Sequence, residues 1–440
     1  MTNVADATPV PSEVQPPARP SLRGLLAQTE IDLRLFGMLL ALAVILLTFN
    51  ILSDGKFFRP TNMVTLAVQA TAVAIIATGM VMVIVSRNID LSVGSLVGFI
   101  AMSYALLMTD WMPNVLGMGV DFPFRWVIAL ALGLALGAAV GALQGFIIAY
   151  IGVPSFIVTL GGLLSIRGAV WYLSSGAAVS GLDSSFQLIG GGAEGSIGGT
   201  LTWILGGVAC LPIIALLLNG RRQRRRYGFP VRPVWAEVLL GVISCGAVLG
   251  LAAFANANLW PTGLVERYAA EHGIPIPAGG LHISTGFPFP IILLIGVTLV
   301  MTWMATRRRF GRYVYAYGGN PDAAELAGIN TRWTILKTYV LMGVLCALAA
   351  AIAAARLNGA TLDVGLGYEL YVIAAAVVGG TSFAGGIGTI PGAVLGAFVM
   401  QSLAYGLSFM GVNSPGQNVV AGIVLIVAVG FDTFNRRRGS

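Results

Sequence analysis

Long apolar runs alternate with short polar segments along most of the chain. The runs are roughly 17–26 residues long, the length that an α-helix needs to cross about 30 Å of hydrocarbon. The pattern predicts an all-α, polytopic transmembrane helical bundle with about 12 spans. The predicted spans cover residues 33–53, 63–85, 91–108, 126–151, 156–174, 200–219, 234–255, 288–306, 333–355, 371–387, 390–410 and 417–434.

Arginines gather in the short segments that separate these spans. Cytoplasmic loops of membrane proteins carry an excess of Lys and Arg, and twelve spans place every cluster, together with both termini, on the cytoplasmic side. The clusters therefore indicate topology anchors that contact anionic lipid, in preference to a nucleic-acid signal. They comprise Arg221–Arg226, Arg307–Arg312 and Arg436–Arg438.

The composition narrows the class of protein further. Of the 440 residues, 57% are hydrophobic and only 10% are charged, whereas soluble domains carry about 25% charged residues. The chain lacks the polar residues for a soluble surface. This excludes a soluble enzyme, a disordered scaffold and a nucleic-acid binder as the main function.

Cysteine and histidine give no sign of a metal site or a disulfide framework. All three cysteines, Cys210, Cys245 and Cys346, lie in apolar runs, which favours small buried side chains. The two histidines, His272 and His282, are too few to ligate a metal ion. We expect neither a metal nor a cofactor.

The ends of the chain are polar. Residues 1–32 are rich in Pro, Ala and Thr and contain no apolar core before a cleavage-like site, so they predict a disordered cytoplasmic tail. Residues 33–435 are expected to form one transmembrane domain, and 436–440 a second cytoplasmic tail.

Glycines recur every four residues in the fourth and eleventh predicted spans. Small residues at this spacing lie on one helix face and allow another helix to approach closely. We interpret them as packing positions, which any function would require. They are Gly133, Gly137, Gly141 and Gly145, and then Gly388, Gly392 and Gly396.

Two polar breaks interrupt apolar stretches of more than forty residues, at 86–94 and 379–386. Similar breaks in the two halves of a chain point to a translocation path. Two ordinary cytoplasmic turns explain the pattern equally well. Asp90, in the first break, suits a helix cap or a partner for Arg87.

Charges within the predicted spans are few. Arg167 lies in the middle of the fifth span, where a cation must face a partner or water. There is no series of membrane carboxylates of the kind that proton-coupled carriers use. This weighs against a secondary carrier, and the absence of a clustered catalytic set weighs against an integral membrane enzyme.

An ATP-binding P-loop requires a lysine within G-x-x-x-x-G-K-[ST]. Neither lysine of the chain, Lys56 or Lys337, lies in such a motif. The chain is therefore not expected to be an enzyme. If it transports actively, a separate chain must hydrolyse ATP.

A short helix is predicted at residues 320–328, within the segment 313–332 between two spans. Asn320 is a good N-cap, and Pro321 suits the first helical position. Gly328 suits the position just after the helix. Its small side chains would let the helix enter a groove on a partner, although a helix that merely joins two spans is also consistent.

Taken together, these segments resemble the permease subunit of bacterial ATP-binding-cassette sugar importers, in the ribose/xylose branch. Four motifs in the same order carry the resemblance, which extends over about residues 35–435. They are Asn88-Ile89-Asp90-Leu91-Ser92-Val93-Gly94-Ser95, Val153-Pro154-Ser155-Phe156-Ile157, Tyr315-Ala316-Tyr317-Gly318-Gly319-Asn320 with Ala323-Ala324 and Ala327-Gly328, and Tyr368-Glu369-Leu370 leading to Gly379-Gly380-Thr381-Ser382.

The resemblance implies a type II importer permease in the bacterial inner membrane that works by alternating access. Its implied partners are two ATP-binding cassette ATPase subunits, a periplasmic sugar-binding protein, a second permease copy and membrane lipid. The breaks and the family motifs make Asn88, Asp90, Thr381 and Ser382 candidates for the substrate pathway. The implied ATPase-coupling residues are Gly319, Asn320, Ala323, Ala324 and Gly328.

An additional hairpin at 200–255 makes the chain more similar to xylose-type than to ribose-type relatives. The expected substrate is therefore D-xylose. Another sugar such as ribose, or a gradient-driven secondary carrier, is the alternative.

Overall fold

The computed structural model describes residues 33–439 apart from 120, 121, 123 and 278. The expected N-terminal tail, residues 1–32, lies outside the described residues. Within the described part, the regular secondary structure is almost all helix, and two short strands form one antiparallel pair.

A helix occupies each of the twelve predicted segments. Ten helical stretches in the described part of the chain are long and apolar enough to cross a membrane, so the protein is a multi-pass membrane protein. They are α2 (Leu33–Leu52), α3 (Pro60–Val85), α4 (Val93–Leu106) with η1 (Leu107–Val115), α5 (Arg125–Phe146) with η2 (Ile147–Ile151), α6 (Ser155–Ser174), α8 (Gly198–Arg226), α9 (Val234–Asn256), α11 (Phe289–Arg307), α14 (Thr331–Leu357) and α16 (Ile390–Phe409).

The remaining elements are shorter or lie between these helices. The strands β1 (Val179–Ser180) and β2 (Gly359–Ala360) pair with each other. The other helices are α7 (Ser184–Gln187), η3 (Leu188–Gly190), α10 (Thr262–His272), α12 (Arg309–Gly319), α13 (Pro321–Leu326), α15 (Tyr368–Val378) and α17 (Ser414–Gly439).

One predicted boundary is wrong. The predicted span 371–387 is a helix of only 11 residues, α15, because the chain turns at the glycines that follow Val378. Eleven residues rise about 16 Å, roughly half of the hydrocarbon thickness. At the C-terminus, α17 continues to Gly439, so residues 436–439 of the expected tail are helical.

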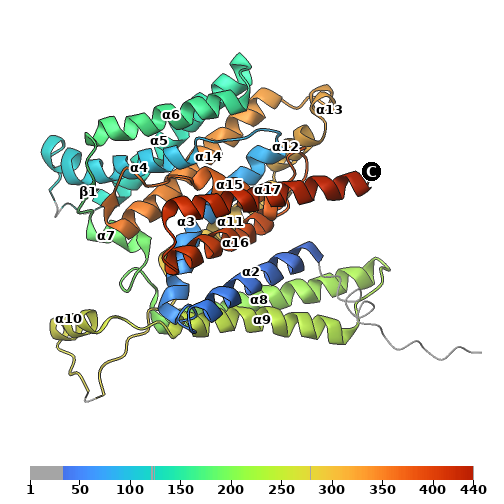
Figure 1. Ribbon diagram of the computed structural model, residues 1–440. Coiled ribbons are helices and arrows are strands. Elements are labelled where there is room, and N and C mark those ends of the chain that lie inside the picture. Colours follow the sequence, from blue (N-terminus) through green and yellow to red (C-terminus); the bar gives the residue numbers. More distant parts are fainter. Residues whose placement is uncertain (1–32, 120–121, 123, 278, 440) are drawn as a thin grey trace, which may run out of the picture.

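The arginine-rich segments share one end of the bundle. The α8–α9 turn, α13 and the C-terminus lie at the right in Figure 1, whereas α7, α10 and β1 lie at the left. Arg221–Arg226 end α8, and Arg307–Arg309 join α11 to α12. We call this the basic end. The shared position of these arginines agrees with the prediction that the clusters lie on one side of the membrane.

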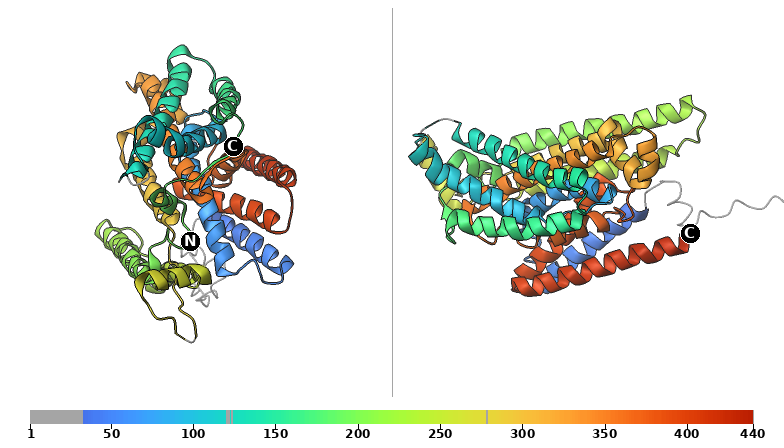
Figure 2. Two further views of the ribbon diagram at one scale, coloured as in Figure 1. Left: turned by 90° about the vertical axis from the view of Figure 1, so that its left-hand side faces the viewer. Right: turned by 90° about the horizontal axis from the view of Figure 1, so that it is seen from above.

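The core of the bundle is built around α3 and α14. Every residue of α3 from Ala70 to Val85 is buried, as expected for a helix that is apolar on all sides. The neighbours of α3 include α11, α14, α15 and α16. By contrast, α2 and the α8–α9 hairpin lie to one side of this core, as Figures 1 and 2 show.

The glycine repeats are packing positions, as predicted. In α5, Gly137 faces the backbone of Gly343 and Gly141 faces that of Tyr339, both on α14. In α16, Gly396 faces the backbone of Ala375 in α15, and Gly392 faces that of Gly379, directly after α15. A side chain at any of these four positions would meet main-chain atoms, which cannot move aside by changing rotamer.

Replacing Gly141 with alanine is therefore expected to destabilise the protein. An added Cβ would collide with the carbonyl of Tyr339, and overpacking of this kind costs about 1–3 kcal/mol. Gly246→Ala in α9 is the matched control, since no atom lies within 4 Å of its added Cβ. A lower thermal midpoint for Gly141→Ala alone would support the assignment, and equal midpoints would contradict it.

Candidate translocation path and coupling site

The first break, residues 86–94, is largely buried and bonded to itself, although Arg87 is exposed. Asn88 Nδ2 donates to the carbonyl oxygen of Ser86 at 2.8 Å. Asp90 Oδ1 accepts from the backbone nitrogen of Ser92 at 2.9 Å and from its hydroxyl at 2.7 Å. Asp90 therefore braces the turn that leads into α4 and makes no ion pair with Arg87, which bonds elsewhere.

Three helices enclose this break. The hydroxyl of Tyr339 on α14 and that of Thr159 on α6 both donate to the carbonyl of Ile89 at 3.3 Å. Gln144 on α5 bonds to the hydroxyl of Ser92 at 3.0 Å. The first break is thus irregular backbone that three helices enclose, a setting in which such backbone is tolerated.

The second break follows α15 and packs against the end of α3. Thr381 and Ser382 are completely buried. The hydroxyl of Ser382 accepts from the backbone nitrogen of Ala384 at 3.1 Å, whereas the Thr381 hydroxyl has no partner among the described residues. The four predicted pathway residues are therefore all covered by protein in this conformation.

Both breaks meet at the end of α12. The backbone nitrogen of Gly386 donates to the carbonyl of Val85 at 3.0 Å. Arg87 Nε donates to the carbonyl of Gly318 at 2.7 Å, and its Nη2 to that of Gly319 at 2.9 Å. We call these five residues the junction. A side chain at Gly318 would collide with the carbonyl of Val85, so this close approach requires glycine.

The junction was not predicted from the sequence. Arg87 was considered only as a partner for Asp90, because residues that are 231 positions apart give no local signal of contact. A further link joins the same elements, since the hydroxyl of Tyr315 on α12 donates to the carbonyl of Gly388 at 2.7 Å.

The short helix α13 follows the junction directly and is capped as predicted. Asn320 Oδ1 accepts from the backbone nitrogen of Ala323 at 3.1 Å, and Gly328 has a φ of +79°. Of the predicted coupling residues, Gly319, Asn320, Ala323 and Gly328 are exposed, whereas Ala324 is buried against the protein itself. Leu326 is 90% exposed and was not predicted.

Arg167, which was expected to face a partner or water in the middle of its span, bonds to backbone carbonyls. Its Nη1 donates to the carbonyls of Leu362 at 2.9 Å and Val364 at 3.1 Å. These carbonyls belong to residues 361–367, which lead from β2 to the start of α15. We call residues 361–367 the α15 entry loop, because they lead into α15, which runs toward the second break at the basic end.

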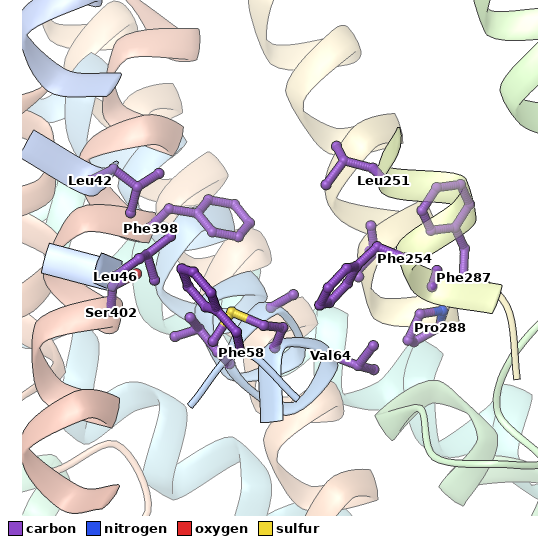
Figure 3. Close-up of a pocket in the computed structure, with 15 residues that line it drawn as sticks. Leu42, Leu46, Phe58, Val64, Leu251, Phe254, Phe287, Pro288, Phe398 and Ser402 are labelled. Carbon is purple, nitrogen blue, oxygen red and sulfur yellow. The ribbon is translucent and has the colours of Figure 1, made fainter. Parts of the chain in front are cut away.

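An apolar cavity of about 400 Å³ lies on another side of the core, between α2, α3, α9, α11 and α16. Figure 3 shows Leu46, Phe58, Phe254 and Phe398 around it. Ser402 is the single polar residue in its lining. Sugar hydroxyls require several polar partners, so this cavity does not suit a sugar.

Comparison with known proteins places the chain among transport-system permeases. The family model described as branched-chain amino acid transport system / permease component matches residues 62–429. No solved structure matches the chain.

Several sugar permeases are similar over most of their length. The xylose transport system permease protein XylH of Escherichia coli strain K12 is 35% identical over 428 residues, covering 97% of this chain and 98% of the relative. XylH of Haemophilus influenzae is 34% identical over 412 residues, covering 93% and 98%. The ribose import permease protein RbsC of E. coli K12 is 31% identical over 392 residues, covering 89% and 91%.

Proposed function

Because the chain belongs to the family described as branched-chain amino acid transport system / permease component, we propose that it is the transmembrane permease of an ATP-driven importer of D-xylose. The observation that carries the proposal is the similarity to two xylose permeases, at 34% and 35% identity, over almost the whole of each chain. A ribose permease is also similar, but with lower identity and lower coverage.

The proposed orientation places the basic end, with both termini, in the cytoplasm. Its support is the positive-inside rule, since the arginine clusters of the α8–α9 turn and of the α11–α12 connection lie there. A periplasmic sugar-binding protein would then contact the opposite end, near α7 and α10. Two ATPase subunits would bind at the basic end, and a second permease copy would complete the pore.

The proposed coupling route runs from α13 to the two breaks. An ATPase that moves α13 would pull on Gly318 and Gly319, which lie directly before the helix cap Asn320. Arg87 is bonded to both carbonyls and lies in the first break, while the backbone of Gly386 joins the second break to Val85. A displacement of α13 would therefore reach both breaks together.

The role of Asn88, Asp90, Thr381 and Ser382 in the pathway remains part of this proposal. All four are buried here, so they would contact sugar only in a conformation that separates the breaks from α3, α6 and α14. Alternating access requires such a second arrangement, because an element must have two states for a partner to bias it.

The test is uptake by liposomes that contain the protein with its ATPase and binding protein. We expect xylose uptake to require ATP on the side of the liposome membrane that holds the ATPase. Uptake should persist when ion gradients across the membrane are collapsed. Ribose and galactose should compete weakly. Uptake by the permease alone, driven by a proton or sodium gradient, would contradict the proposal and favour a secondary carrier.

A further inference from the structure

Four arginines line one cavity at the basic end of the bundle. The cavity has a volume of about 600 Å³ and lies where α11 ends and α12 begins. Four of the seven residues that line it are Arg307, Arg308, Arg309 and Arg312, and the other three are apolar or aromatic. No acidic side chain is among these described lining residues. The cavity therefore concentrates positive charge around a space that a ligand can enter.

The tight turn between the two helices brings these arginines together. Gly311 of α12 lies against the carbonyls of Met304 and Ala305 at the end of α11, and an added Cβ would collide with both oxygens. Only glycine at this position lets α12 fold back directly on α11. As a result, Arg309 and Arg312, which follow the turn, line the same cavity as the arginines before it.

Contacts within the protein use few of the guanidinium donors. Arg312 Nη1 donates to the carbonyl of Arg307 at 3.4 Å. The guanidinium carbon of Arg308 lies 3.9 Å from the centroid of the Trp303 ring, a cation–π contact that needs no N–H donor. In the described part of the chain, none of the four arginines is paired with a carboxylate. Since a guanidinium carries several N–H donors, most of them remain available to an anion.

An exposed apolar stripe leads away from the cavity along α11. Ile295, Leu299 and Trp303 are all exposed, and their spacing of four residues places them on one face of the helix. Trp303 belongs both to this stripe and to the cavity lining. The surface is thus cationic at one end and apolar along a helix long enough to cross the membrane. A phospholipid with an anionic headgroup matches this order of groups, whereas a free phosphate ion or an acidic protein surface would leave the stripe unused.

We propose that this cavity binds the headgroup of an anionic phospholipid, whose acyl chains lie along the α11 stripe. The lipid phosphate accepts hydrogen bonds from the arginines, and charge-assisted bonds between a guanidinium and a phosphate are among the strongest hydrogen bonds in proteins. Basic clusters attract anionic lipid in general, but here one lipid occupies one defined cavity. Binding requires only that the basic end lies at a membrane surface, whatever the substrate is.

The bound lipid also holds the start of the helix that leads to the junction. Arg309 begins α12, and Gly318 and Gly319 end it. Gly318 is nine residues beyond Arg309, a rise of about 14 Å. The two ends of one helix therefore carry the lipid site and the junction, and a lipid that restrains α12 favours the coupled arrangement. This consequence, unlike the binding itself, rests on the proposed function.

Native mass spectrometry of the purified protein tests the binding. Phosphatidylglycerol and phosphatidylcholine with identical acyl chains are added in equal amounts. We expect phosphatidylglycerol to be retained at least about tenfold better, because two or more arginines contact its charge. Equal retention of the two lipids would overturn the proposal. Displacement of phosphatidylglycerol by equimolar inorganic phosphate would also overturn it, since the cavity would then recognise a free anion.

A double variant locates the bound lipid. Arg308→Gln with Arg309→Gln removes two charges from the cavity and is expected to abolish the preference for phosphatidylglycerol. Arg222→Gln with Arg225→Gln is the matched control, because it removes two exposed arginines from the same end and neither of them lines this cavity. A preference that survives in the cavity variant would overturn the assignment, and loss of ATPase association in that same variant would then assign the arginines to the ATPase.

Transport in liposomes measures the consequence for coupling. The liposomes are made of phosphatidylcholine and contain the protein with its ATPase and binding protein. Adding phosphatidylglycerol is expected to raise xylose uptake per ATP hydrolysed at least about threefold in the wild type and in the control, but not in the cavity variant. Equal uptake in both lipid mixtures, with lipid binding intact, would overturn the effect on coupling. Absence of uptake in every mixture would instead overturn the proposed function and leave the lipid site standing.

Discussion

Replacing Arg87 with glycine is expected to disconnect ATP hydrolysis from sugar uptake while leaving the fold intact. Arg87 has a φ of +59°, a conformation that glycine adopts more readily than arginine. The turn itself should therefore tolerate the change. What disappears is the pair of hydrogen bonds to the carbonyls of Gly318 and Gly319.

The expected size follows from the strength of those bonds. A hydrogen bond to a charged group contributes about 1.5–3 kcal/mol, and the partial exposure of Arg87 places these two at the lower end. Because 1.4 kcal/mol corresponds to a factor of ten, we expect a loss of roughly 10- to 100-fold in xylose uptake per ATP hydrolysed. The measurement is uptake and ATP hydrolysis in the same liposomes.

Two further variants distinguish the loss of the two hydrogen bonds from the loss of a positive charge. Arg87→Lys keeps the charge but cannot reach two carbonyls with a planar fork, so it should restore little of the coupling. Arg222→Ala removes an exposed arginine from α8 and should change neither activity. Full coupling in Arg87→Gly would show that the junction does not transmit movement.

Replacing Leu326 with glutamate is expected to prevent assembly with the ATPase. Leu326 is 90% exposed at the end of α13, where a large apolar side chain gains nothing unless a partner covers it. Full burial of a leucine contributes about 1.5–3 kcal/mol, and a charge in the same groove adds a desolvation penalty. We expect at least a tenfold weaker association and a nearly complete loss of uptake.

Co-purification of the ATPase and a titration of its binding would measure this effect. Leu326→Met is the matched control, because methionine is also apolar and of similar volume, and it should bind normally. The α13 cap at Asn320 does not involve Leu326, so the variant should still insert and fold. Undiminished association of Leu326→Glu would exclude α13 as the ATPase contact.

Features that depend on near neighbours in the sequence could be predicted. The sequence predicts α13 because Asn320, Pro321 and Gly328 act on their own neighbours, and the structure confirms the cap. It predicts packing by Gly137 and Gly141 because their spacing already places them on one helix face. Neither inference needs to know which helix lies opposite.

The tenth predicted span shows where such patterns mislead. Residues 371–387 are apolar enough to suggest a full helical crossing, but α15 ends at Val378 and is preceded by an irregular loop that is bonded to Arg167. The loop is held there because Arg167 donates hydrogen bonds to its carbonyls, and because the glycines of α4 let its backbone pack closely. Those groups are 198 positions or more away from Gly365, so hydropathy along the chain does not report them.

The sequence by itself therefore determined the class of protein, the positions of the long helices and the self-capped α13, because hydrophobic length and helix capping act between near neighbours. Only the tertiary structure decided where polar groups meet. It joined Arg87 to Gly318 and Gly319, and Arg167 to the α15 entry loop, residues 361–367. The physical reason is that a buried hydrogen-bonding group must find a partner in space, and for Arg87 and Arg167 that partner lies on another segment, at a sequence distance that no local pattern encodes.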